Sequence, residues 1–127
     1  MSLIDRMNEE EGLLTMRSAT KEQIINAEKQ LELHFAKDYI AYLESFGTAT
    51  FADHELTGIC SSERLNVVDA TMRARKRYPQ MPQRYYVVEE WNIDHVIVVQ
   101  DSQGIIYEYG PLDKAKERFN SLEEYLF

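Results

Sequence analysis

The sequence predicts an α+β fold in which N-terminal helices pack on one face of a mostly antiparallel sheet and a short helix closes the chain. Three observations indicate this fold: amphipathic helical spacing over residues 20–47, three β-rich runs between residues 85 and 110, and a helix-capping pattern near the C-terminus. Helices and strands that are separated along the chain, rather than alternating, favour the α+β class over a parallel α/β one.

Two short helices joined by a tight turn are predicted over residues 20–47. Thr20 and Gln23 have the spacing of a capping box at the start of the first helix. Asp38 is predicted to cap the second helix, and Gly47 to end it in the left-handed conformation. Apolar residues at helical spacing predict the buried faces, which are Ile24, Ala27, Leu31 and Phe35 in the first helix and Tyr39, Tyr42, Leu43 and Phe46 in the second.

The segments that flank this pair are shorter. Residues 1–16 predict an acidic helix or a loose arm that is interrupted at Gly12, and residues 50–59 predict a short strand pair. Residues 65–77 have helical spacing, and this helix is expected to end before Pro79. Ser121 and Glu124 form a second capping box, which predicts the closing helix.

The sheet is predicted from residues 85–91, 95–100 and 104–109, which are rich in β-branched and aromatic residues. Short connections at residues 92–94 and 101–104 make these strands an antiparallel meander. Strict alternation places Glu89 on the face of Val87 and Trp91, and Glu90 on the opposite face. One face is expected to pack on the helices, and the other is left with aromatic side chains beside acidic ones.

The chain of 127 residues is expected to form a single domain, residues 1–127, with its core in residues 20–127. Its hydrophobic content of 44% is sufficient for one core. Cys60 has no second cysteine to pair with, which fits a reducing compartment. No apolar run reaches membrane-spanning length, and no secretory signal is visible. A cytoplasmic protein is therefore expected.

Charge is unevenly distributed along the chain, whose net charge is −8. Residues 1–62 and residues 85–127 each have a net charge of −6, whereas residues 63–84 have a net charge of +4. An acidic protein repels nucleic-acid phosphates and attracts basic proteins, although acidic surfaces also serve solubility alone. The basic segment predicts either phosphate binding or a basic helix face that answers the acidic surfaces, and we favour the second.

Sequence patterns that carry catalysis are not found. There is no glycine-rich phosphate loop, and His34, His54 and His95 do not have the spacing of metal ligands. His54 lies between Asp53 and Glu55, where it predicts either a base or metal ligand, or a solvated turn, and we favour the turn. We therefore assign no catalytic, metal-binding or cofactor-binding residue and expect a protein that is not an enzyme.

The helical pair resembles the N-terminal signature of the SUKH superfamily, the Smi/Knr-type domain. The matching residues are Ile24, the Ala27-Glu28 pair, Leu31, Asp38-Tyr39, Leu43 and Gly47, and Phe35-Ala36 stands where the family has Leu-Pro. The resemblance continues to the end of the chain and so covers residues 20–127. The later matches are a short strand that ends in a Gly-Ile pair, here Leu56-Thr57-Gly58-Ile59, and then Phe119, Leu122, Tyr125 and Leu126.

The resemblance implies an immunity protein of bacterial polymorphic toxin systems, which binds and neutralises a cognate toxin domain without chemistry of its own. A basic nuclease toxin would suit the acidic surface. The alternative is an adaptor or regulatory protein-binding module of the same family. Neither direct nucleic-acid binding nor membrane binding is expected, and a monomer and a homodimer both stay open. The residues predicted to bind the partner are Glu89, Glu90, Trp91, Asp94, Glu108 and Tyr109.

Overall fold

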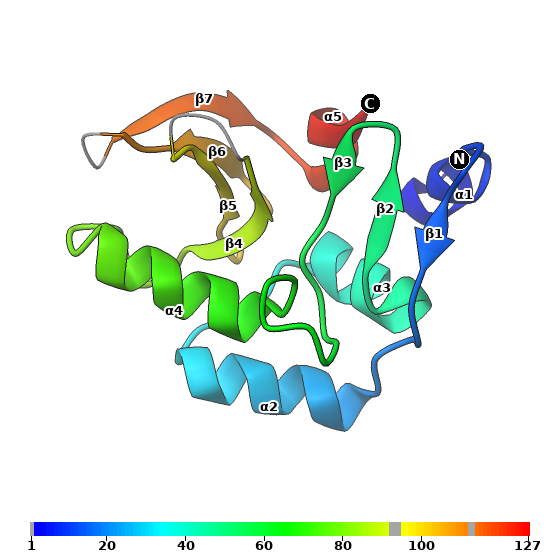
Figure 1. The fold of residues 1–127 in the computed structure, drawn as a ribbon, viewed down its shortest axis with the longest axis horizontal. Coiled ribbons are helices and arrows are strands. Elements are labelled where there is room, and N and C mark those ends of the chain that lie inside the picture. The colour runs from blue at the N-terminus through cyan, green and yellow to red at the C-terminus, as the bar shows by residue number, and fades with distance from the viewer. Residues whose placement is uncertain (1, 92–94, 112–113) are drawn as a thin grey trace.

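Two antiparallel sheets form the centre of the computed structural model, which describes residues 2–91, 95–111 and 114–127 (Figure 1). The smaller sheet has the order β1-β2-β3, with β1 Leu14–Thr15, β2 Ala49–Phe51 and β3 His54–Glu55. The larger sheet has the order β4-β5-β6-β7, with β4 Tyr86–Glu90, β5 Ile97–Gln100, β6 Ile106–Tyr109 and β7 Ala115–Phe119. An isolated antiparallel bridge between Leu56 and Glu89 joins the two sheets.

Helices cover both faces of the larger sheet. The main core combines one face of the larger sheet, which contributes Tyr86, Val88, Val98 and Ile106, with Ala49 and Phe51 of the smaller sheet and with residues of four helices, which are α1 Leu3–Asn8, α2 Lys21–Leu31, α3 Lys37–Phe46 and α5 Leu122–Leu126. This arrangement confirms the predicted fold class. The helix α4 Val67–Arg77 packs on the opposite face, where Ala70 and Ala74 meet Val87 and Val99. The expectation that this second face is left open is therefore wrong.

Local capping was predictable where its partners are close in sequence. Thr20 Oγ1 accepts the Gln23 N–H at 3.1 Å, and Gln23 Oε1 accepts the Thr20 N–H at 2.9 Å, so the predicted capping box is confirmed. Ser121 Oγ likewise accepts the Glu124 N–H at the start of α5. The Glu124 carboxylate accepts the N–H of Asn120, whereas the predicted capping box requires the N–H of Ser121.

Asp38 does not cap its own helix, so that prediction is wrong. The α3 helix begins after Ala36 without a side-chain cap. One Asp38 oxygen instead accepts the N–H of Leu122, the first residue of α5, at 2.8 Å. The other Asp38 oxygen accepts a hydrogen bond from Nε2 of Gln100 on β5 at 2.9 Å. The carboxylate thus caps the N-terminus of α5, 84 residues further along the chain.

Gly47 and Gly58 bring two backbone segments into direct contact. Gly47 ends α3, as predicted, but with a φ of 71° and a ψ of −65° it does not adopt the expected left-handed helical conformation. A Cβ on Gly58 would lie 1.7 Å from the carbonyl oxygen of Gly47, which no side chain tolerates. The same oxygen accepts the N–H of Ile59 at 3.1 Å. The Gly-Ile pair that resembled the family pattern is therefore needed for the passage from β3 toward α4.

Two strands were not predicted as such. Residues 1–16 contain both the short helix α1 and the strand β1, and Gly12 with a φ of 76° lies between them. The strand β7 was missed because its sequence, Ala-Lys-Glu-Arg-Phe, is charged and has no run of β-branched residues. The predicted turn at residues 92–94 lies outside the described residues.

Candidate protein-binding site

A β-bulge in β4 decides which way its acidic residues point. Val87 pairs with Val99, but Glu89 pairs with Val98, so Val88 is an extra residue in the ladder. Glu89 therefore contacts β3 and α5, on the side of the main core, and Glu90 contacts α4. Glu89 and Glu90 point to opposite sides, as predicted, but the bulge reverses the faces, so that Glu90 and not Glu89 lies on the side of Val87.

The Glu89 carboxylate is buried and accepts three hydrogen bonds. Its Oε1 lies 3.0 Å from Nδ1 of His54 and 2.5 Å from the hydroxyl of Tyr125, and its Oε2 accepts the N–H of Glu55 at 2.6 Å. Tyr125 in turn accepts a hydrogen bond from Nε1 of Trp91 at 3.2 Å. This Glu89 cluster (His54, Glu55, Glu89, Trp91 and Tyr125) ties both sheets to the C-terminal helix.

Electrostatics within the Glu89 cluster favour a charged His54. The hydrogen bond to Glu89 raises the pKa of His54 above its ordinary value of 6.5, and the charges of Glu89, Asp53 and Glu10 act in the same direction. Burial, followed by the charge of Glu89, raises the pKa of the Tyr125 hydroxyl, which therefore stays a donor. The solvated turn favoured for His54 is wrong, since the residue lies in β3 and its side chain is 23% exposed.

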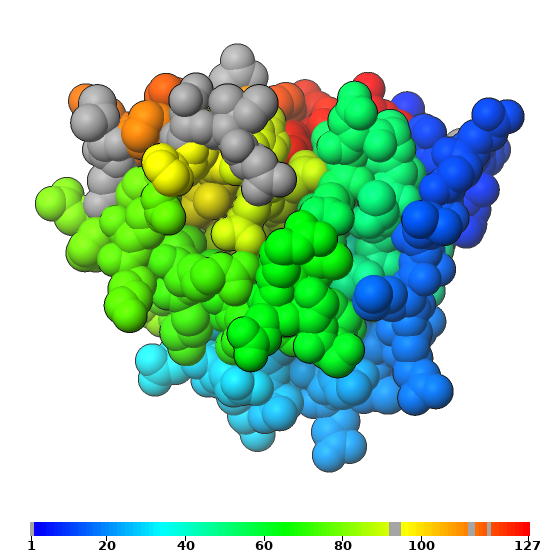
Figure 2. Space-filling view, in the orientation of Figure 1, coloured from blue at the N-terminus to red at the C-terminus, as the bar shows by residue number. Residues whose placement is uncertain are grey.

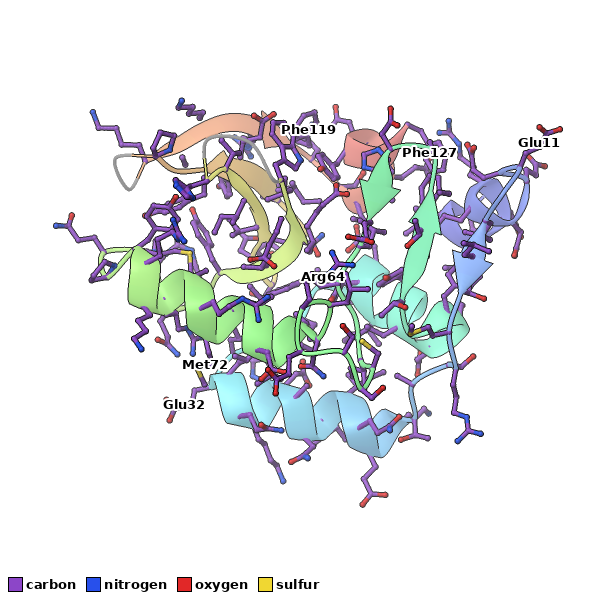
Figure 3. All side chains as sticks on the ribbon, viewed as in Figure 1. Glu11, Glu32, Arg64, Met72, Phe119 and Phe127 are labelled. Carbon is purple, nitrogen blue, oxygen red and sulfur yellow. The ribbon has the colours of Figure 1, made fainter. Side chains whose placement is uncertain are left out.

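A cleft of about 340 Å³ lies beside the Glu89 cluster, between the two sheets and α4. Figure 3 shows Arg64 in front of the gap between the sheets. The guanidinium of Arg64 makes a bidentate contact with the carboxylate of Glu55, and Arg73 donates to Glu90 at 2.8 Å. The side chains that give the cleft its character are Glu55, Arg64, Arg77, Glu90, Trp91 and Ile97.

Trp91 is the exposed aromatic residue of this cleft. Its side chain is 39% exposed, yet its indole N–H is fixed by Tyr125, whose own hydroxyl is fixed by Glu89. A large aromatic ring that is held in place before binding loses little conformational entropy when a partner covers it. Aromatic residues in such surroundings are frequent hot spots of protein interfaces. Trp91 with its support therefore has the properties of a contact residue.

The residues predicted to bind a partner divide into three groups. Glu90 and Trp91 line the cleft. Glu89 and Tyr109 are buried, each 3% exposed, which corrects the expectation that they lie on an open surface. Glu108 lies half-buried in β6, and Asp94 lies outside the described residues. The structure thus brings Glu89, Glu90 and Trp91 together, with Glu89 as a support.

Sequence reasoning missed Arg64, Arg77 and Tyr125, all of which are far from Trp91 in sequence. No local motif connects these residues, because the β3–β4 bridge and the docking of α5 place them. Three arginines of the basic segment make contacts within the fold. Arg73 bonds Glu90, Arg75 donates to the carbonyl oxygens of Leu31 and Gln83, and Arg84 stacks on Tyr85.

Across the part of the chain that the structure describes, no three His, Cys, Asp or Glu residues are grouped so as to hold a metal ion. Within the same residues, every helix is too short or too polar to span a bilayer.

The fold and the cleft define a class: an α+β domain with two joined antiparallel sheets and a cleft of mixed charge at their junction. The chain belongs to the SUKH superfamily, since the SUKH_5 family model, described as "SMI1-KNR4 cell-wall", matches residues 1–127. A crystal structure of a protein from Pseudomonas syringae pv. tomato is similar in fold, with a TM-score of 0.79 and 12% identity over 96% of this chain and 91% of that one. A comparison with curated proteins finds no match.

Proposed function

We propose that this protein is a cytoplasmic immunity protein that binds a cognate toxin domain and neutralises it without catalysis of its own. Membership of the SUKH superfamily supports the class of protein-binding module. The observation that carries the proposal is Trp91, a partly exposed indole fixed by Tyr125 at the rim of a cleft. The paired charges of Glu55 with Arg64 and Glu90 with Arg73 give this cleft a polar rim around an aromatic residue.

The toxin domain is proposed to be basic, as nucleases commonly are. A net charge of −8 attracts a basic protein and speeds its association, and it disfavours direct binding of nucleic acid or of an anionic membrane. Blocking then follows from coverage of the toxin's active surface.

The proposal is tested by co-expression with the toxin domain that it predicts to be encoded beside this gene. Wild-type protein is expected to restore growth. Trp91→Ala should weaken binding by roughly 2 kcal/mol or more, about thirtyfold in Kd, because a buried interfacial aromatic residue is lost. Ile25→Ala is the matched control, since Ile25 is 50% exposed on α2 and lies outside the cleft. Unimpaired killing of cells that express both wild-type proteins would sink the proposal.

A second candidate is a regulatory adaptor, which the "cell-wall" description of the matching family model favours. It uses the same cleft for a cellular partner. Affinity purification from the native cells separates the two candidates by the identity of a partner whose binding depends on Trp91. A toxin domain supports immunity, and a cell-wall assembly protein supports the adaptor.

A further inference from the structure

The outer edge of β1 is open. Among the residues that the structure describes, β2 is the one strand that pairs with β1. Residues 14–18 are all exposed, and Figure 2 shows this N-terminal segment running along one side of the molecule. Leu14 is 68% exposed and Met16 is 51% exposed, so two large apolar side chains lie at this edge. An open edge with apolar side chains is a ready template for another strand.

The backbone of β1 is oriented to accept that strand. Met16 shares its N–H between the carbonyl oxygens of Phe46 at 3.2 Å and Thr48 at 3.3 Å, so this N–H points toward the β2 side. Thr15 lies opposite Ala49, whose carbonyl oxygen accepts the N–H of Leu56 on the far side. By the alternation of an antiparallel ladder, the N–H and C=O of Thr15 therefore point away from β2, toward solvent.

Because the bridge between Leu56 and Glu89 joins the two sheets, β7 is the outer strand at the opposite end from β1, and cationic side chains protect it. The exposed residues Lys114, Lys116 and Arg118 occur at alternate positions in and beside β7. Cationic side chains on an outer strand disfavour edge-to-edge pairing. The strand β1 has an apolar pair, Leu14 and Met16, in the corresponding place, and Arg17, which follows the pair, is the one cation of the exposed segment 14–18. The edge of β1 therefore has a single cation where β7 has a series of them.

The open face of the smaller sheet leads from β1 to the cleft. Leu14 lies opposite Thr50, and Thr50 lies opposite Glu55, so these three residues form one row across the sheet. Glu55 binds Arg64 in the wall of the cleft. A strand added to β1 would thus extend this row, whose other end reaches the cleft that Trp91 lines.

Charge decides which kind of strand fits. Glu9, Glu10 and Glu11 precede β1, separated from it by Gly12 and Leu13, and Figure 3 shows Glu11 projecting away from the molecule at this end. Opposite charges attract across such an edge, and like charges repel. A second copy of this chain would bring another net charge of −8 and a second acidic run to the edge. A basic partner strand therefore fits better than self-association.

We propose that β1 is a strand-addition site for an extended segment of the partner protein, in which apolar residues alternate with lysine or arginine. Backbone hydrogen bonds to Thr15 provide the pairing, Leu14 and Met16 bind the apolar residues, and Glu9 to Glu11 bind the cations. The inference rests on the proposed function for the toxin as the partner, and it adds the segment by which the toxin is held.

The test uses a short blocked peptide of alternating valine and lysine, titrated against the isotope-labelled full chain and followed by NMR. The amides of residues 14–17 should shift, and the Thr15 amide should exchange more slowly with solvent. Thr15→Pro removes the outward N–H without breaking a bond to β2 and should weaken peptide binding about tenfold. Leu14→Lys, which leaves the backbone unchanged, should weaken it comparably, and Ile25→Lys is the matched control.

Three results would overturn the inference. The first is that the peptide causes no shift in the amide signals of residues 14–17. The second is that a valine–glutamate peptide binds equally well. The third is that, without peptide, the Thr15 amide is protected from exchange and the protection increases with protein concentration. The last result would identify a second copy as the occupant. If the protein neutralises a toxin but does not bind the peptide, the proposed function stands and the strand-addition site is wrong. If the protein binds the peptide at β1 but neutralises no toxin, the strand-addition site stands and the toxin is wrong as its partner.

Discussion

His54 and Glu89 form a hydrogen-bonded ion pair at the junction of the two sheets, although they are 35 residues apart. The pair raises the pKa of His54 above 6.5 in the folded state. Because the folded value is the higher one, the protonated histidine stabilises the fold. This stabilisation is fully present below the unfolded value of 6.5, and it is lost as the pH rises through the folded value.

We expect the His54→Gln variant to lose this dependence on pH. Wild-type protein should melt at a lower temperature as the pH is raised from about 6 to about 8, and the variant should show a flatter curve. His34→Gln is the control, because the His34 ring is 87% exposed and lies 3.8 Å from Glu28. If the melting temperatures of wild type and His54→Gln change equally with pH across this range, the prediction is contradicted.

The α5 helix depends on a cap supplied by another helix. It spans five residues, too few to be stable alone, and the Asp38 carboxylate of α3 accepts the N–H of Leu122 at its start. The same carboxylate binds Gln100, so it connects α3, β5 and α5. Loss of Asp38 would leave one backbone and one side-chain donor without this acceptor.

Asp38→Ala is expected to destabilise the protein by roughly 1–3 kcal/mol, the range for an unsatisfied buried donor and a lost cap. The measurement is the urea midpoint of unfolding. Glu44→Ala, which removes an exposed carboxylate from the same helix, serves as the control and should change the midpoint little. Equal midpoints for the two variants would show that the cap contributes nothing.

The elements that the sequence predicts well are those with local signals. The helical spacing over residues 20–47 and the Thr20 capping box concern residues within one or two turns. The role of Asp38, the direction of Glu89 and the position of β7 depend on partners far along the chain, and no local pattern contains that information. The candidate site was half predictable for the same reason: Glu90 and Trp91 carry a local signal, whereas Arg64 and Tyr125 reach Trp91 only through the fold.

At the scale of the whole molecule, the net charge is −8, whereas the cleft is lined by residues of both signs. Salt screens long-range attraction, with a Debye length of about 10 Å at 0.1 M and about 3 Å at 1 M ionic strength. Contacts inside a desolvated interface are screened much less. The net charge of −8 should therefore act on the rate of encounter with a basic partner more than on the lifetime of the complex.

We expect the association rate with the proposed toxin partner to fall about tenfold or more between 0.05 M and 0.5 M salt, with little change in the dissociation rate. Biolayer interferometry at several salt concentrations measures both rates. Replacing the exposed Glu9 and Glu11 by glutamine should reduce the salt dependence, and Glu22→Gln on α2 is the control. An association rate that is independent of salt would exclude electrostatic steering.

The hydrogen bond from Trp91 to Tyr125 has a spectroscopic consequence. Trp91 is the one tryptophan in the sequence, and it lies at the cleft. The emission of an indole depends on its exposure to water and on its hydrogen bonds, so the intrinsic fluorescence of this protein reports on a single place. A partner that covers the cleft would displace water from the ring and move the emission to shorter wavelength. The protein therefore carries its own label at the site where binding is proposed.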